Sequence, residues 1–122
     1  MRILITGSRH WSDKPAVAKA IMLACNRFGV NNFSEVTVVH GDAPGADTLA
    51  KQVAEEYGMQ VEAHPADWRK HGKAAGPLRN QRMVALGADI CLAFPEPGSR
   101  GTLDCMRRAE AAGIGVVDHG VR

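Results

Sequence analysis

Apolar stretches alternate with amphipathic stretches along the whole chain, and this alternation predicts the secondary structure. Five short apolar runs have the length and composition of β-strands, at residues 2–6, 35–40, 59–63, 89–94 and 114–117. Several of these runs are continuously apolar, which is typical of parallel strands covered on both faces. Between them, apolar residues recur at helical spacing, which predicts four helices.

Start and stop signals bound these predicted helices. Pro15 lies in the first turn of the first helix and Pro77 opens the third, positions that suit a residue without an N–H. Gly58, Gly87 and Gly113 follow the second, third and fourth helices, where a glycine commonly ends a helix. Strands and helices therefore alternate from one end of the chain to the other.

This order predicts an α/β fold. Because parallel strands joined by helices cross over with a right hand, we expect one small Rossmann-like, doubly wound domain over residues 1–122. Its five-stranded sheet would be mostly parallel, with helices on both faces. The length of 122 residues suits one hydrophobic core rather than two. Residues 65–76 remain as a long loop, and we expect its residues 67–76 to cover the functional site.

Glycine-rich and polar segments follow four of the predicted strands. In an open α/β sheet, ligands bind beyond the carboxyl ends of the strands, so these segments predict a binding site. The candidate binding residues are Gly7, Ser8, Arg9, Gly41, Asp42, Gly45, Asp47, Asp67, Trp68, Lys73, Arg79, Asn80, Gly98, Ser99, Arg100, Gly101 and Thr102. We expect the pocket between the loops that follow the first and fourth strands.

The chemistry of these segments suits a nucleotide. Residues 98–102 open the fourth helix, where free N–H groups and the helix dipole favour a phosphate, and Arg79 would add a cation. Asp42 and Asp47 would repel a phosphate and suit ribose hydroxyls, while Trp68 offers a ring for a base. The alternative for either glycine-rich loop is a plain turn with a good helix cap.

Composition and charge narrow the classes of partner. Lys and Arg number 15 against 13 Asp and Glu, and this net charge of +2 is too small for general nucleic-acid affinity unless the cations cluster. No apolar run approaches the roughly 18 residues of a membrane span. The chain reaches Gly7 before a signal-peptide segment could form, which predicts a cytoplasmic protein.

Neither a metal nor a cofactor is expected. Cys25, Cys91 and Cys105 lie far apart without a C-x-x-C pair, and they fall on predicted core faces. The five histidines lack metal-ligand spacing. We therefore expect the thiols to be reduced and to serve in packing.

Taken in order, the motifs resemble those of the YspA/cpYpsA-related branch of the SLOG superfamily. They read GSR at 7–9, GDAPGAD at 41–47, PADW at 65–68, GKAAGPLRN at 72–80 and SRGT at 99–102. SLOG proteins are small, Rossmann-like and related to the Lonely Guy cytokinin-activating enzymes and to DNA-processing protein A. The resemblance covers nearly the whole chain and implies that it binds a nucleotide-derived ligand.

The similarity to the Lonely Guy enzymes themselves is partial. Their R-K-x-x-M motif is similar to residues 79–83, with Arg79 and Met83 in place and Asn80 differing. Their P-G-G-x-G-T-x-x-E loop is similar to residues 97–105, with Cys105 where the catalytic glutamate stands. Asp104 would replace this acid only if the helix turned it toward the crevice, about 100° away from Cys105.

Three functions follow from these observations. The missing glutamate favours a sensor or carrier of a nucleotide-derived small molecule. The alternative is a phosphoribohydrolase-type N-glycosidase acting on nucleoside monophosphates, with Arg79 on the phosphate and Asp104 or Asp47 as the catalytic acid. Single-stranded nucleic-acid binding is less favoured by the small net charge. A homo-oligomer, in which a neighbouring chain completes the site, stays open.

Overall fold

Five strands form one parallel sheet in the computed structural model, which describes residues 1–120. The strands are β1 (Arg2–Gly7), β2 (Thr37–His40), β3 (Gln60–Ala63), β4 (Ile90–Phe94) and β5 (Val116–Asp118). They lie in the order β3-β2-β1-β4-β5, and every neighbouring pair is parallel. This confirms the predicted doubly wound α/β fold, and the strand order reverses between β1 and β4.

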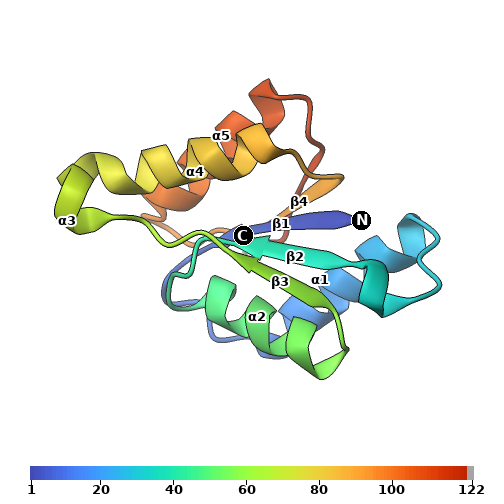
Figure 1. Ribbon diagram of the computed structural model, residues 1–122. Coiled ribbons are helices and arrows are strands. Elements are labelled where there is room, and N and C mark those ends of the chain that lie inside the picture. The colour runs from blue at the N-terminus through green and yellow to red at the C-terminus, as the bar shows by residue number, and fades with distance from the viewer. Residues whose placement is uncertain (121–122) are drawn as a thin grey trace.

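Two helices cover each face of the sheet (Figure 1). On one face lie α1 (Lys14–Arg27) and α2 (Ala46–Glu56), and on the other lie α4 (Ala75–Leu86) and α5 (Arg100–Ala111). Successive strand residues point to opposite faces, so β1 contributes Ile3 and Ile5 to the core under α1 and α2, and Leu4 to the core under α4 and α5. No helix within residues 1–120 has both the length and the apolar character to cross a membrane.

The segment expected to be a long loop is partly helical, which corrects that prediction. It contains α3 (Trp68–His71) and the 3-10 turn η2 (Gly72–Ala74), and α4 begins at Ala75, before Pro77. Asp67 caps α3, because its Oδ1 accepts the N–H of Lys70 at 3.1 Å. A helix of four residues is too short to show an apolar period, so the sequence pattern missed it. A second 3-10 turn, η1 (Phe33–Glu35), precedes β2.

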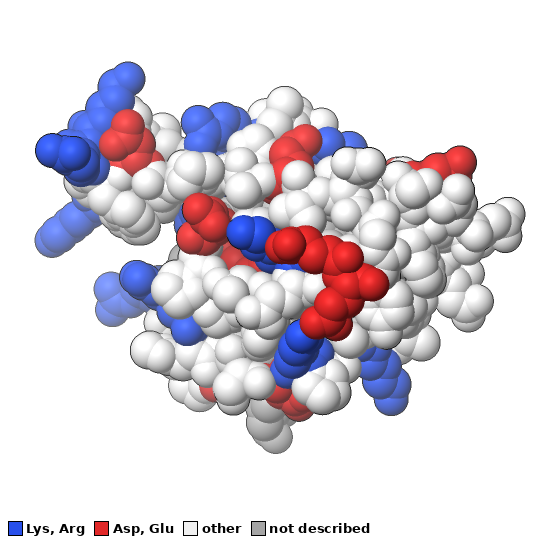
Figure 2. All heavy atoms as spheres, turned by 60° about the horizontal axis from the view of Figure 1, so that its bottom comes forward, with Lys and Arg blue, Asp and Glu red and all other residues white. Residues whose placement is uncertain are grey.

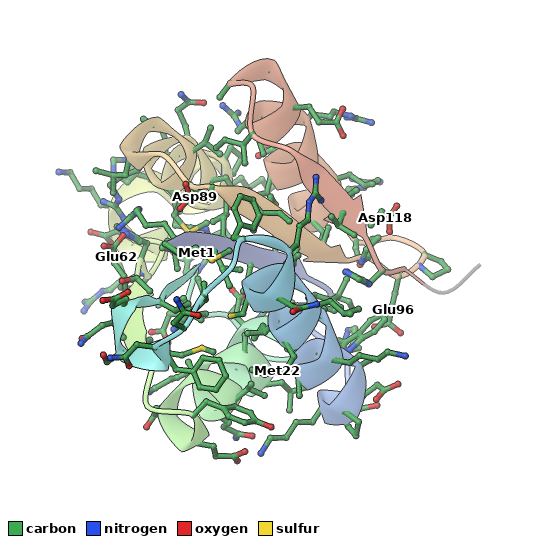
Figure 3. All side chains as sticks on the ribbon, turned by 90° about the vertical axis from the view of Figure 1, so that its right-hand side faces the viewer. Met1, Met22, Glu62, Asp89, Glu96 and Asp118 are labelled. Carbon is green, nitrogen blue, oxygen red and sulfur yellow. The ribbon has the colours of Figure 1, made fainter. Side chains whose placement is uncertain are left out.

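Arg2 makes polar contacts near the N-terminus, on the side of the sheet away from α3. Arg2 donates to both carboxylate oxygens of Glu62, at 3.0 and 2.8 Å, and to the carbonyl of Gly87 at 3.0 Å. Asp89 accepts the main-chain N–H of Arg2 at 2.7 Å. Figure 3 shows Glu62 and Asp89 on this side, beside Met1. Arg2 thus joins β1 to β3 across β2, and the opposite ends of the strands are left for the site.

Candidate functional site

The loop after β1 is tied to its neighbours on both sides. Ser8 donates its N–H to the carbonyl of Phe94 at the end of β4 (2.9 Å), and its own carbonyl accepts from Ala46 at the start of α2 (3.1 Å). A Cβ at Gly7 would lie 2.5 Å from the Cβ of Ala46, so this approach requires glycine. The loops after β1 and β4 therefore lie side by side, as predicted.

Asp47 holds the loop between β2 and α2 from inside. Its Oδ2 accepts the N–H groups of Gly41 at 3.0 Å and of Ala43 at 3.3 Å. Gly45 precedes α2 with a φ of 78°, and a Cβ there would lie 2.2 Å from the carbonyl oxygen of Ser8. The shape of this loop thus depends on one carboxylate and one glycine.

The other carboxylate oxygen of Asp47 has no hydrogen-bond partner among the described residues. The side chain is only 5% exposed, and burial raises the pKa of Asp47 to about 6. Asp42, in the same loop, has a backbone φ of 57° and an exposed side chain whose carboxylate accepts no hydrogen bond within residues 1–120. Of the two acids predicted to meet ribose hydroxyls, Asp42 is wholly available and Asp47 offers its Oδ1.

Arg79 and Asn80 at the start of α4 connect two loops of the site. Arg79 donates through Nη1 to the carbonyl of Gly41 and through Nε to Oδ1 of Asn80, the latter at 2.9 Å. The Nδ2 of Asn80 donates to the carbonyl of Gly101 at 3.1 Å and to Oδ2 of Asp104 at 3.0 Å. Because Asn80 is 3% exposed and bonded on both amide atoms, it positions Arg79 and the start of α5.

The first turn of α5 presents unused donors. The N–H groups of Gly101 and Thr102 have no acceptor within the described part of the chain. No heavy atom from elsewhere in the fold comes within 4 Å of a Cβ built at Gly101, so the space in front of this turn is open. Ser99 braces the turn, since its Oγ accepts the N–H of Glu96 at 3.1 Å. These N–H groups lie where the sequence predicts a phosphate, at the positive end of the α5 dipole.

Asp104 and Cys105 point to different surroundings. Cys105 is fully buried beside Leu4 and Cys91 in the core under α5, and burial raises its pKa to about 11. Asp104 borders the pocket, but its Oδ2 also pairs with Nε of Arg108 at 2.9 Å. The helix thus turns Asp104 toward the crevice, as a replacement for the missing glutamate requires. Cys105 stays in the core, where a thiol with a raised pKa is unsuited to acid–base chemistry.

These segments enclose a pocket of about 950 Å³, the upper part of the usual range for small-molecule sites. All but two of the predicted binding residues line it. They are Gly7, Ser8, Arg9, Gly41, Asp42, Asp47, Trp68, Lys73, Arg79, Asn80, Gly98, Ser99, Arg100, Gly101 and Thr102, and Asp104 joins them. Gly45 and Asp67 do not line the pocket, because Gly45 packs against the backbone of Ser8 and Arg9 and Asp67 caps α3.

Three further polar residues line the pocket and were not singled out in the sequence. Thr6, at the end of β1, hydrogen-bonds with the buried Cys105, and its place inside an apolar strand gave no signal. His10 follows Arg9 directly, so its position in the motif was a usable signal. Glu96 has a buried Oε1 without a partner among the described residues, and it follows the end of β4 closely.

Within residues 1–120, no group of three or more His, Cys, Asp or Glu side chains is arranged to hold a metal ion. The described site therefore consists of main-chain N–H groups, one buried acid, one partly buried arginine and an exposed rim.

Comparison with known proteins identifies the family of this chain. The chain is 47% identical over 124 residues to the Gene 61 protein of Mycobacterium phage D29, covering 98% of this chain and 96% of that protein. The family model described as the YspA, cpYpsA-related SLOG family matches residues 1–71, which include β1, the loop after β2 and α3. The chain therefore belongs to the YspA/cpYpsA-related SLOG family.

Proposed function

We propose that this protein binds a nucleotide-derived small molecule as a sensor or carrier. The observation that supports the proposal best is the pair of unused N–H groups of Gly101 and Thr102. They lie in the first turn of α5, and both residues line the pocket together with Arg79. A phosphate there would accept N–H groups at the positive end of a helix dipole and meet a guanidinium. Family membership is consistent with a nucleotide-related ligand.

The rest of the ligand would lie along the remaining walls of the pocket. Asp42 and Oδ1 of Asp47 would accept hydrogen bonds from ribose hydroxyls. Trp68, which is 56% exposed and borders the pocket, would stack on the base. Asn80 and Gly45 act indirectly in this proposal, by positioning Arg79 and the loop before α2.

Gly101→Asp tests the phosphate site without removing a packing group. The change places a carboxylate at the second position of α5, where a negative charge favours the helix but repels a phosphate. We expect binding of nucleoside monophosphates, measured by calorimetry, to weaken by about 10- to 100-fold, while stability is kept or raised. Pro15→Asp is the matched control, because Pro15 holds the same position in α1 outside the pocket.

A screen of wild-type protein against nucleoside monophosphates precedes this comparison. A ligand at 100 times its Kd stabilises the folded protein by about 2.7 kcal/mol, which a thermal shift detects. Equal nucleotide affinity of the wild type and Gly101→Asp would show that the start of α5 does not bind the phosphate. The absence of a thermal shift with every nucleotide would overturn the proposed function.

Asp47 supports a second candidate, N-glycosidic cleavage of a nucleoside monophosphate. Its buried Oδ1 lacks a partner in the described residues and its pKa is raised to about 6, properties of a catalytic acid or base. Asp104, the other candidate acid, shares its Oδ2 between Asn80 and Arg108. The assay is release of free base from bound monophosphates. If Asp47→Asn abolishes the release of free base and Asp104→Asn retains it, catalysis is assigned to Asp47. If the wild type releases no base, only the binding function remains.

A further inference from the structure

A second hollow lies beside the main pocket. It has a volume of about 730 Å³ and is bordered by α3, the first turns of α4 and the segment after β3. The two hollows share Pro65, Ala66 and Arg79 in their walls, so they are neighbours across one short stretch of chain. In Figure 2 the α3 segment projects from the body of the molecule with basic side chains gathered on it.

Positive charge dominates the second hollow. Lys70, Arg79 and Arg82 line it together with Asp67 as the one carboxylate, a formal surplus of two positive charges. Lys70 and Arg82 form no ion pair within residues 1–120, and Arg82 donates through Nη2 to the carbonyl of Pro65 at 3.3 Å. Asp67 is engaged at the cap of α3. Within residues 1–120, Lys70 and Arg82 are therefore without a carboxylate partner and can meet an anion.

Arg79 links this charge to the main pocket. Its Nη1 and Nε serve Gly41 and Asn80, and its Nη2 has no acceptor in the described part of the chain. Arg82 follows three residues later on α4, which puts the two side chains on neighbouring turns about 5–6 Å apart at Cβ. Unused hydrogen-bond donors thus continue from the N–H groups at the start of α5, past the guanidinium of Arg79, into the second hollow.

We propose that the second hollow binds a second phosphate of the same ligand, which makes the ligand a small nucleotide whose two phosphates are separated by its nucleoside. A nucleoside 3′,5′-bisphosphate is the simplest member of this class, and its 2′-hydroxyl is the one ribose hydroxyl left for Asp42 and Asp47. The inference rests on the proposed function, since the first phosphate occupies the start of α5. A nucleoside 5′-diphosphate would keep both of its phosphates at the start of α5 and leave Lys70 and Arg82 without a phosphate.

Matched nucleotides test the inference. We would measure binding of the 5′-monophosphate, 5′-diphosphate and 3′,5′-bisphosphate of each of the four common ribonucleosides by calorimetry at physiological salt. For the preferred base, the 3′,5′-bisphosphate should bind at least about tenfold more tightly than the other two, because charge-assisted contacts to phosphate are strong. The double variant Lys70→Gln/Arg82→Gln should erase this gain and leave monophosphate affinity within about twofold, since both residues lie outside the main pocket.

Lys19→Gln/Arg107→Gln is the control for net charge. Lys19 and Arg107 are exposed and line neither hollow. Their substitution removes the same number of positive charges, so the gain in bisphosphate affinity should survive in this variant. A bisphosphate that binds no better than the monophosphate, an equal gain from the 5′-diphosphate, or a gain that survives Lys70→Gln/Arg82→Gln would each overturn the inference while the main pocket stands. Failure of every nucleotide to bind would overturn both proposals.

Discussion

Asn80 on α4 donates its side-chain N–H to the main-chain carbonyl of Gly101 on α5, at 3.1 Å. The same buried amide accepts from Nε of Arg79 at 2.9 Å. One side chain therefore sets the place of the guanidinium relative to the N–H groups at the start of α5. Where a Lonely Guy enzyme has lysine, this chain has an uncharged residue that is satisfied by the protein itself.

Asn80→Ala should loosen this connection. The change leaves buried donors and acceptors unpaired, so we expect a loss of about 1–3 kcal/mol in the free energy of unfolding, measured in urea. Nucleotide affinity should fall with it, because Arg79 and α5 lose their common support. Gln81→Ala is the control, since Gln81 is exposed and only accepts from Arg108, and it should change stability by less than about 0.5 kcal/mol. Equal effects of the two variants would contradict the positioning role.

Asp47 should give the protein a pH dependence of unusual sign. Its pKa is about 6 in the folded protein against 3.8 ordinarily, so the folded state binds the proton more tightly. The stability due to this proton is present below pH 3.8 and is lost as the pH rises through about 6. Glu62, whose pKa Arg2 lowers to about 2, acts in the opposite direction at lower pH.

Asp47→Asn isolates this effect. Asparagine keeps an oxygen for the N–H groups of Gly41 and Ala43 but does not titrate. Urea unfolding of both proteins from pH 4 to 8 should show the wild type losing about 2–3 kcal/mol relative to the variant, mostly before pH 6.5. Glu62 cancels in the difference because both proteins carry it. A difference that is constant with pH would show that Asp47 titrates normally.

Gly45→Ala should be far more harmful than Gly58→Ala. Both glycines have positive φ, 78° and 73°, where a side chain is strained by about 1–2 kcal/mol. A Cβ at Gly45 would also lie 2.2 Å from the carbonyl oxygen of Ser8, whereas a Cβ at Gly58 meets nothing within 4 Å. We expect Gly58→Ala to lower the free energy of unfolding by about the backbone strain alone. Gly45→Ala should lower it by about 2 kcal/mol or more beyond that, as measured by thermal unfolding. Similar losses at the two positions would show that the loop before α2 yields easily.

Trp68 should report ligand binding by fluorescence. It is 56% exposed at the pocket, whereas Trp11, the second tryptophan, is 7% exposed and packs against Phe94. Stacking of a base on Trp68 should quench and shift its emission, and Trp68→Phe should abolish the change while keeping most of the affinity. A ligand-induced signal that persists in Trp68→Phe would place the response at Trp11 instead.

Most of the fold was accessible from the sequence, because local patterns determine it. Strands buried on both faces are apolar throughout, as Ile90–Phe94 are, and helices buried on one face repeat their apolar residues every three or four positions. Trp68–His71 is too short to contain a full helical period, so the pattern predicts a loop where α3 lies. The ends of elements also differ from the pattern, since Glu35 belongs to η1 and β2 begins only at Thr37.

For the candidate site, the sequence predicts which residues lie together but not what each side chain does. Parallel strands bring their carboxyl ends to one edge, so the sequence alone determined that Gly7, Gly41 and Gly98 would meet there. What each side chain does was decided by tertiary contacts. Asp42 and Asp47 look alike in the motif, yet one is exposed and the other is buried with a raised pKa. The burial that raises the pKa of Asp47 is a property of the packed fold, so the sequence of the motif does not encode it.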